Sequence, residues 1–303
     1  MSAHYKLPQE EHEIILKKLQ EKTFRGAETS GNPTLYVLGG QPGAGKSQLI
    51  ELSRKDSPGA VTINGDEYRK YHPQADEIFR KHDKDFAKMT DPDVREWTRE
   101  VFDEAKARCY DIIFEGTMRT EQICETMKDF KAEGYQVVVR VVAAHELESR
   151  TAIYGRYEQQ LQTFGTARFT DRASHDAAYT GMLKTLDRIE KEGLADKLEA
   201  YNRDGHCVFS SSREAPRQGV GQAVMEERTR RGKSDAMKDC ATSLDRILRS
   251  MESRGEALEY VEDVRGLLAE AVTSKSRDLE TIRGRLELAS METAAKFSGE
   301  PPL

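Results

Sequence analysis

Short apolar runs alternate with amphipathic stretches up to about residue 215. Apolar runs at residues 34–38, 61–64, 112–114, 136–142 and 207–210 predict buried strands. Helical periodicity is found at residues 10–24, 48–54, 91–108, 120–132 and 146–197, with a polar loop at 164–171 inside the last stretch. Strands that alternate with helices imply right-handed crossovers, so we expect an α/β fold with a mainly parallel sheet flanked by helices.

One of these helices has a start marked by its own residues. Asp91 is of the type that caps helix N-termini, and the fixed φ of Pro92 suits the first helical position. We therefore expect this helix to begin at Asp91.

The pattern changes beyond Pro216, where charged helical sequence is almost unbroken. Two apolar stripes run through it at helical spacing, one from Leu244 to Met251 and one from Leu258 to Leu268. We expect one domain over residues 1–215 and a helical C-terminal extension over residues 216–303. The stripes require partners, so the extension packs on the first domain, dimerises, or inhibits that domain in cis.

Composition and charge narrow the functional classes. The 303 residues include 47 Lys and Arg against 53 Asp and Glu, a net charge of −6, so nucleic acid and anionic membranes are not expected partners. The longest apolar stretch, Val137–Ala144, is interrupted by Arg140 and is far shorter than a membrane span. The 4 cysteines form no C-x-x-C pair, which is typical of structural thiols in a reducing compartment. We expect a soluble, cytoplasmic protein.

The strongest motif is a complete G-x-x-x-x-G-K-[ST] between a predicted strand and a predicted helix. It consists of Gly40, Gln41, Pro42, Gly43, Ala44, Gly45, Lys46 and Ser47. In such a loop backbone N–H groups surround a phosphate, the lysine reaches the β- and γ-phosphates and the serine hydroxyl binds Mg²⁺. The motif predicts binding of ATP or GTP with Mg²⁺, a P-loop NTPase or kinase-like fold, and Ser47 as the metal ligand.

Acidic residues follow two further strands. Asp66 and Glu67 come after the strand at 61–64, and Glu115 ends the run Ile112–Phe114, so both groups are expected at the carboxyl edge of the sheet, where such folds bind ligands. A carboxylate there could accept a proton from an acceptor hydroxyl or hold metal-bound water. The plainer alternatives are a helix cap in a solvated turn for Asp66 and a surface acid for Glu115.

Two arginines in the region 146–197 are further candidates. Guanidinium groups stabilise the charge on a phosphoryl group in transit, and Arg156 and Arg168 could serve this purpose. From the residues alone, a surface role is the more common one for an arginine.

The motifs together resemble the zeta toxin family, the P-loop kinases of epsilon–zeta toxin–antitoxin systems. The matching stretches are GQPGAGKS, NGDEY with the following His72-Pro73, IIFEGTMRT, RYE at Arg156, TAR ending at Arg168, His175-Asp176, and YNRDG at residues 201–205. The resemblance covers residues from about 10 to 212. It implies ATP-dependent phosphorylation of the 3′-hydroxyl of the amino sugar in UDP-N-acetylglucosamine, which blocks peptidoglycan precursor use.

The resemblance also implies roles for single residues. Lys46 and Ser47 hold phosphate and Mg²⁺, Asp66 is the general base, and Arg156 and Arg168 neutralise the transferring phosphate. Glu115, Thr117 and Arg119 bind the sugar substrate. A further substrate-contacting glutamate of the family falls on Arg99, so Glu100, one residue away, takes its place in the prediction.

The resemblance implies a partner as well, a small antitoxin that blocks nucleotide entry near residues 10–24, unless the C-terminal helices inhibit in cis. The sequence is also compatible with two other functions. The same kinase could act on another nucleotide-linked or small hydroxyl compound, as the Arg99 departure suggests. The chain could also be a nucleotide-gated interaction protein whose output is the helical extension.

Overall fold

The computed structural model describes residues 5–82, 85–165, 167, 169–212 and 219–273. The strands are β1 (Thr34–Gly39), β2 (Val61–Ile63), β3 (Ile112–Glu115), β4 (Gln136–Val142), β5 (Lys197–Tyr201) and β6 (Cys207–Ser212). The helices that precede β4 are α1 (Gln9–Thr23), α2 (Ser47–Asp56), α3 (Gly65–Tyr68), the 3₁₀ turn η2 (Arg69–Tyr71), α4 (Ala75–His82), α5 (Phe86–Ala107) and α6 (Gln122–Ala132). Those that follow it are α7 (Glu146–Phe164), α8 (Arg172–Glu192), α9 (Val220–Arg231), α10 (Ala236–Arg254) and α11 (Leu258–Val272).

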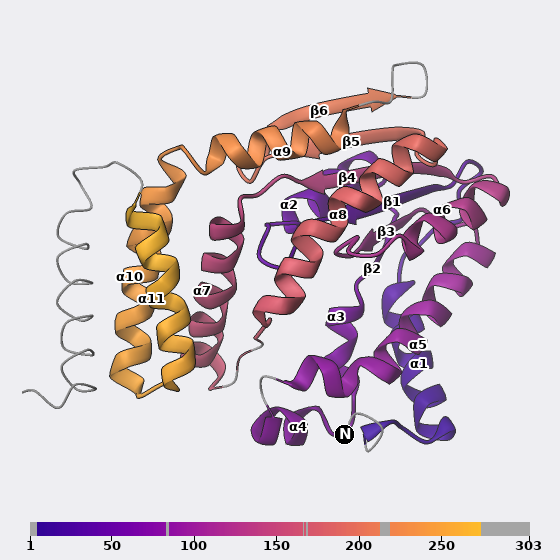
Figure 1. Ribbon diagram of the computed structural model, residues 1–303. Helices are drawn as coiled ribbons and strands as arrows, with labels where there is room; N and C mark the ends of the chain where they lie inside the picture. The colour runs from indigo at the N-terminus through magenta and orange to yellow at the C-terminus, as the bar shows by residue number, and fades with distance from the viewer. Residues whose placement is uncertain (1–4, 83–84, 166, 168, 213–218, 274–303) are drawn as a thin grey trace, which may run out of the picture.

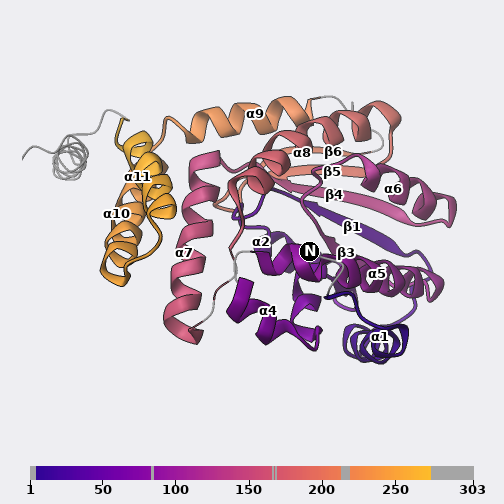
Figure 2. The same ribbon diagram turned by 60° about the horizontal axis from the view of Figure 1, so that its bottom comes forward.

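The strands form one sheet in the order β2-β3-β1-β4-β5-β6 (Figures 1 and 2). All neighbouring pairs are parallel except β5 and β6, which are antiparallel. The predicted α/β fold with a mainly parallel sheet is therefore confirmed. The order brings the carboxyl ends of β1, β2 and β3 to the same edge of the sheet.

The two faces of the sheet are buried by different helices. Leu35 and Val37 of β1 belong to a large core that also contains apolar residues of α1, α5, α6, α8 and α9. Tyr36 and Leu38 point to the other face, where α2 contributes Leu49. Alternate residues of one strand thus enter different cores, as the period of a strand requires.

A second core joins the end of the chain to α7. The predicted stripe from Leu244 to Met251 is buried on α10 and packs with Ile153 and Tyr157 of α7 and with apolar residues of α11. Helices α10 and α11 lie side by side next to α7, on the side of α7 away from α5 (Figure 1). Helices α10 and α11 therefore pack on α7, while residues 274–303 lie outside the described residues.

The expected start of the helix at Asp91 was wrong. Helix α5 begins at Phe86 and contains Pro92 in its interior. Phe86 and Met89 are buried with Ile78 of α4, and this burial stabilises an additional turn before the proline. Tertiary packing thus overrides the local cap signal.

The strand β5 was also absent from the expected elements, because its sequence KLEAY carries a glutamate at its centre. Glu199 is buried opposite Arg140 of β4, and the Arg140 Nε donates to its carboxylate at 2.9 Å. Arg140 also donates to Ser53 Oγ at 2.8 Å and pairs with Asp56, so α2 completes the network. A strand that buries an ion pair does not show the apolar pattern by which strands are identified.

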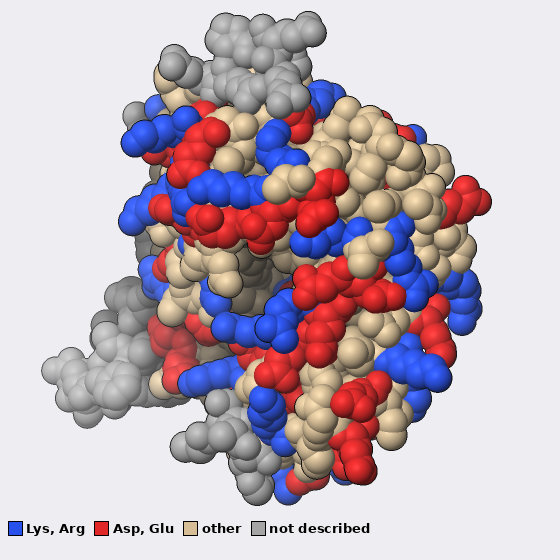
Figure 3. Space-filling view, turned by 90° about the vertical axis from the view of Figure 1, so that its right-hand side faces the viewer, with Lys and Arg blue, Asp and Glu red and all other residues tan. Residues whose placement is uncertain are grey.

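Charges of both signs are mixed on one face of the molecule. Figure 3 views the side of the molecule that carries α1, α5 and α6, where Lys and Arg are interspersed with Asp and Glu. Within the described ranges, no helix has the length and apolar character required to cross a membrane.

Candidate functional site

The P-loop connects β1 to α2 and has the backbone geometry that a phosphate cradle requires. Gly43 and Gly45 have φ values of +78° and +95°, in the region that favours glycine. A Cβ on Gly43 would lie 2.1 Å from the carbonyl oxygen of Ser149 on α7, so any larger residue would displace the loop. The Lys46 Nζ donates to the carbonyl of Gly40 at 2.9 Å, which places the ammonium group inside the loop.

Gln41 is the loop residue that anchors the cradle to its surroundings. Its side chain is fully buried and donates to the carbonyl of Ala144 at 3.0 Å and to Ser149 Oγ at 3.2 Å. Its own Oε1 accepts a hydrogen bond of 3.3 Å from Arg228 Nη2 on α9. The Gln41 side chain therefore fixes the loop against α7 and α9, while the loop backbone faces the phosphate position.

Arg228, the partner of Gln41, is a buried cation. It donates to the carbonyl of Tyr179 at 2.9 Å, and its guanidinium lies 3.7 Å from the centre of the Tyr179 ring. Burial lowers the pKa of Arg228 to about 10, which still leaves it charged at neutral pH.

The hydrogen bonds that hold Gln41 continue from Ser149 to a histidine and an aspartate of α8. Ser149 Oγ lies 2.8 Å from His175 Nε2, and His175 Nδ1 lies 2.8 Å from Asp176 Oδ1. The carboxylate requires the proton on Nδ1, which leaves Nε2 as the acceptor for the serine hydroxyl. Burial lowers the pKa of His175, so the ring is neutral at neutral pH.

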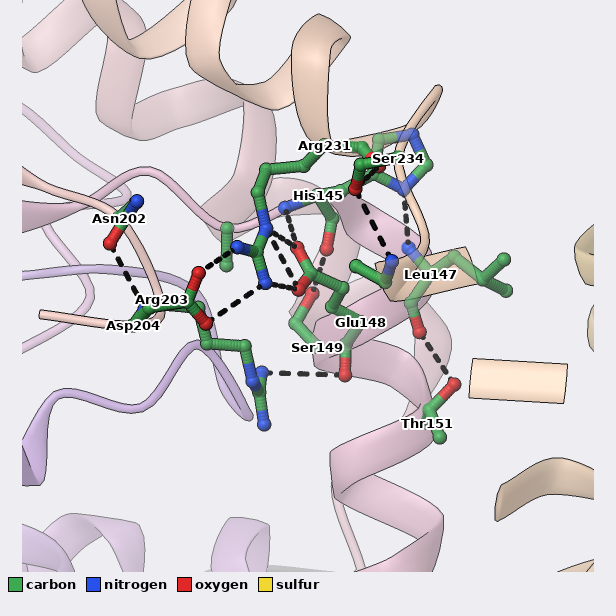
Figure 4. Close-up of polar contacts among 12 residues, drawn as sticks. His145, Leu147, Glu148, Ser149, Thr151, Asn202, Arg203, Asp204, Arg231 and Ser234 are labelled. Atoms are coloured by element: carbon green, nitrogen blue, oxygen red, sulfur yellow. Dashed lines mark hydrogen bonds and ion pairs between the residues drawn. The ribbon is translucent and has the colours of Figure 1, made fainter. Parts of the chain in front are cut away.

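Arg231 at the end of α9 joins three segments (Figure 4). Its guanidinium pairs with Glu148 at the start of α7, where Nε to Oε1 is 3.1 Å, and with Asp204 in the β5–β6 turn. The neighbouring Arg203 donates to the carbonyl of Gly43 in the P-loop at 2.6 Å. The hydrogen bond with Glu148 raises the pKa of Arg231 above its ordinary value. The P-loop is thus held from this side by the hydrogen bond of Arg203, whose neighbour Asp204 is fixed by Arg231.

The acidic candidates lie on the opposite side of the P-loop, where β2 and β3 end. Asn64 caps α3 by accepting the backbone N–H of Asp66 at 2.9 Å, and its Nδ2 donates to Glu115 Oε2 at 2.5 Å. Glu115 Oε1 lies 3.9 Å from Lys46 Nζ. The structure therefore brings Lys46, Asp66 and Glu115 together around Asn64.

Arg69 ties the Asp66 turn to α5. Its Nε donates to Asp66 Oδ1 at 3.1 Å, and its Nη1 donates to Thr90 Oγ1 at 3.0 Å. The Asp66 side chain remains 45% exposed, so it is positioned by Arg69 and still accessible to a substrate.

The segment after Glu115 is anchored through its backbone. The N–H of Gly116 donates to the carbonyl of Leu38 at 3.0 Å, and the carbonyl of Met118 accepts from Thr185 Oγ1 of α8 at 2.8 Å. Thr117 is half-buried and Arg119 is exposed. Both stand directly beyond Glu115, at the same edge of the sheet as the P-loop.

Three other candidates are placed differently. Glu100 lies at the contact between α5 and α1, where its Oε2 is 2.8 Å from His12 Nε2, and the structure does not bring it into the cluster around Asn64. Thr98 on another face of α5 is the residue that approaches the Asp66 turn, at Gly65. Arg156 lies about two turns along α7 from Ser149 and lines a groove beside α10. Arg168 lies outside the described residues.

The protein ligand that the described residues offer to a cation is the hydroxyl of Ser47, and this suits a magnesium ion that is held mainly by nucleotide phosphates. Among the described residues, no group of three or more His, Cys, Asp or Glu side chains could hold a metal. Ser47 stands at the first residue of α2, next to Lys46. Mg²⁺ is commonly held by few protein ligands together with phosphate oxygens and water, so a hydroxyl at this position is a suitable ligand.

Sequence reasoning missed several residues that position the site. They are Asn64, Arg69, Arg203, Arg228 and Arg231. Asn64 carried a readable signal, because asparagine before an acidic turn is a common helix cap. Arg69 stands only three residues from Asp66, a spacing that is visible in a sequence, and Arg203 belongs to the YNRDG run. Arg228 and Arg231 carried no signal, since their partners are distant in sequence.

Known proteins provide a comparison for this arrangement. The family model described as zeta toxin matches residues 17–214. Toxin zeta of Enterococcus hirae is 30% identical over 194 residues, which are 63% of this chain and 68% of the relative. Toxin zeta of Streptococcus pyogenes is 28% identical over 234 residues, which are 76% of this chain and 80% of the relative.

A solved structure shares the fold. It comes from the PezAT chromosomal toxin–antitoxin system of Streptococcus pneumoniae and superposes with a TM-score of 0.71 at 22% identity. The match covers 80% of this chain and 98% of the other. The common architecture thus extends beyond the segment that the family model matches.

Proposed function

Because this chain belongs to the zeta toxin family, we propose that it is an ATP-dependent kinase that phosphorylates the 3′-hydroxyl of the amino sugar in UDP-N-acetylglucosamine. The observation that supports the proposal most directly is the cluster at the edge of the sheet. Lys46 Nζ lies 3.9 Å from Glu115 Oε1, and Asn64 joins Glu115 to the Asp66 turn. The P-loop lysine and the two strand-end acids thus lie at one edge of the sheet, which supports a phosphoryl transfer there.

In the proposed reaction the acceptor oxygen bonds to the γ-phosphorus while the bond from that phosphorus to the bridging oxygen of ATP breaks and ADP leaves. Asp66 takes the proton of the attacking hydroxyl, and Arg69 keeps its carboxylate oriented. Lys46 stabilises charge on the β- and γ-phosphates. Bound magnesium, held by Ser47, supplies further charge neutralisation on the phosphates.

The remaining assignments follow from the family motifs. Glu115, Thr117 and Arg119 bind the sugar nucleotide, and Arg156 and Arg168 neutralise the phosphoryl group in transit. Glu100 is bound to His12, so its assignment to the substrate requires that this contact be given up.

The proposal includes a restraint on the activity, because such a kinase depletes a precursor of its own host's cell wall. The relatives are named toxins, and the solved structure belongs to a toxin–antitoxin system. A small antitoxin protein is therefore the proposed partner, with inhibition by the C-terminal helices as the alternative.

The test is to incubate the purified chain with Mg²⁺, ATP and UDP-N-acetylglucosamine and to weigh the sugar nucleotide by mass spectrometry. We expect one phosphate to be added by the unaltered chain and not by Lys46→Ala. A chain that binds ATP but leaves UDP-N-acetylglucosamine unchanged, in the full-length form and after removal of residues 274–303, would contradict the proposed acceptor.

A further inference from the structure

The register of the sheet places Asn64 beside one of the two acids of the site. Strand β2 pairs with β3 so that Ile63 lies opposite Phe114, and the next residues along the two strands are Asn64 and Glu115. On its other side, Glu115 lies opposite Leu38 of β1, the strand that leads into the P-loop. Glu115 therefore stands between Asn64 and the strand that carries the phosphate cradle.

The amide of Asn64 makes two hydrogen bonds of opposite kind. Its Oδ1 accepts the backbone N–H of Asp66 at 2.9 Å, and its Nδ2 donates to Glu115 Oε2 at 2.5 Å. The reverse orientation of the amide would set its oxygen against the carboxylate and its NH₂ group against the N–H. Only one orientation satisfies both partners, so the side chain of Asn64 is fixed by them.

Capping of α3 does not by itself require an asparagine. Serine and aspartate cap helix N-termini about as well as asparagine does. Serine, however, has no second polar atom for Glu115, and an ionised aspartate has no hydrogen to donate. The amide at position 64 is thus explained by its bond to Glu115 and not by the cap alone.

The turn that follows Asn64 packs closely on α5. A Cβ on Gly65 would lie 2.8 Å from Thr98 Oγ1, so the turn approaches this helix without space for a side chain. The turn gives Asn64 a defined position from which its Nδ2 holds one oxygen of Glu115. The other oxygen of this carboxylate, Oε1, lies 3.9 Å from Lys46 Nζ. Glu115 is thereby oriented between an amide and the P-loop lysine.

We propose that Asn64 is a positioning residue of the kinase, whose amide sets the Glu115 carboxylate in the orientation that receives the acceptor substrate. The inference rests on the proposed function and deepens it, because it assigns the alignment of the acceptor to a neutral residue that acts through Glu115. The same side chain caps the turn that carries Asp66, so it fixes the proposed base and the substrate acid relative to each other.

The experiment uses two substitutions that keep the cap and change the contact with Glu115. Asn64→Ser keeps a capping oxygen and removes the donor, whereas Asn64→Asp keeps the shape and the cap and sets a second carboxylate beside Glu115. The measurements on the full chain are kcat and KM for UDP-N-acetylglucosamine, the Kd of ATP, and the pH profile of kcat/KM. Chemical denaturation shows whether the cap is retained, since both variants should unfold close to the midpoint of the unaltered chain.

We expect Asn64→Ser to raise the KM for the sugar nucleotide roughly tenfold and to leave the Kd of ATP within about twofold, because only a hydrogen bond to the substrate acid is lost. In Asn64→Asp two neighbouring carboxylates disfavour each other's ionised form. The acid limb of its kcat/KM profile should therefore move to higher pH by about one pH unit or more, whereas that of Asn64→Ser should stay in place.

A double substitution tests whether Asn64 acts through Glu115. In a Glu115→Ala background, Asn64→Ser should change kcat/KM by less than about twofold, because the group that Asn64 positions is already absent. An undiminished effect in that background would overturn the inference.

Two further results would also contradict the proposed role of Asn64. Single variants with the KM and the pH profile of the unaltered chain would overturn it and leave the proposed function intact. A loss of ATP binding as large as the rise in KM would overturn it as well, because the effect would then extend to the P-loop. If the unaltered chain did not phosphorylate UDP-N-acetylglucosamine, the proposed function would fail and the inference with it.

Discussion

The two sides of the P-loop are built differently. On the side of β4 and β5, the loop is held by Gln41, Ser149 and Arg228, which are all buried. On the side of β2 and β3, Asp66 is 45% exposed and Glu115 is 20% exposed, and Asn64 and Arg69 hold them through single hydrogen bonds.

This difference in burial indicates which side of the P-loop is the more rigid. Buried ionic and hydrogen-bonded networks fix a geometry strongly, because any departure leaves a polar group unsatisfied away from water. The side of β4 and β5, called the nucleotide side below after the proposed function, is therefore the more rigid one. On the side of β2 and β3, called the acceptor side below, the carboxylates of Asp66 and Glu115 stay accessible. Substitutions on the two sides should therefore affect different measurements.

The largest effect is expected on the acceptor side, at Asp66. Asp66→Ala removes the proposed base and should lower kcat by roughly 10²–10⁴-fold while ATP binding is retained. The measurements are the steady-state rate of phosphoryl transfer and the Kd of ATP. The matched control is Glu67→Ala, because Glu67 is 65% exposed and pairs only locally, with Lys70 at 2.7 Å. Near-normal turnover in Asp66→Ala would remove this residue from the role of base.

On the nucleotide side, the expected effect is on stability. Arg231→Ala leaves the buried carboxylate of Glu148 without its cation and should lower the free energy of unfolding by about 3 kcal/mol. Arg54→Ala is the control, because Arg54 is 49% exposed and its partner Glu51 is 66% exposed, so the loss of this pair should cost about 1 kcal/mol or less. Both values are measured by chemical denaturation. An equal loss of unfolding free energy in the two variants would show that the buried ion pair of Arg231 with Glu148 stabilises the fold no more than an exposed pair does.

A smaller effect on the nucleotide side should depend on pH. Folding lowers the pKa of His175, so protonation favours the unfolded chain. The stability contribution is complete above the unfolded-state pKa of about 6.5 and is lost as the pH falls from there through the folded-state pKa. The free energy of unfolding should therefore fall less steeply between pH 7 and pH 5 in His175→Gln than in the unaltered chain. Parallel pH profiles would show that His175 does not titrate differently on folding.

The smallest effect is expected at Glu100, which was a substrate candidate from the sequence. Its contact with His12 predicts that Glu100→Gln changes the KM for the sugar nucleotide by less than about twofold and weakens folding by about 1 kcal/mol. A rise in KM with unchanged stability would instead return Glu100 to the substrate site.

Much of the fold could be predicted because its signals are local. The strands β1 to β4 are short apolar runs, and most helices around them have clear periodicity, so the alternation of strands with helices and the mainly parallel sheet could be predicted, although α3 and α4 were not among the expected elements. Strand β5 could not be found this way, because Glu199 is buried only through Arg140 on another strand. The start of α5 depends likewise on contacts of Phe86 with a separate helix.

The same distinction applies to the candidate site. The P-loop and the acids after β2 and β3 occur in continuous motifs, and the structure places Lys46, Asp66 and Glu115 together. The buried arginines that support the loop bind partners far away in the chain, with Arg228 and Gln41 separated by 187 positions. Such pairs leave no spacing signal, so they become visible only when the fold is known.

The hydrogen bond between Arg228 and Gln41 determines how short a working version of this protein can be made. A fragment that stopped after β6 would keep all residues of the phosphate-binding motif, yet it would expose Gln41 and Tyr179 where Arg228 is now packed. It would also leave Glu148 without Arg231. A fragment that keeps the P-loop supported as it is in the full chain must therefore extend at least to Arg231, and a design that trims or fuses the chain should keep α9 with the P-loop.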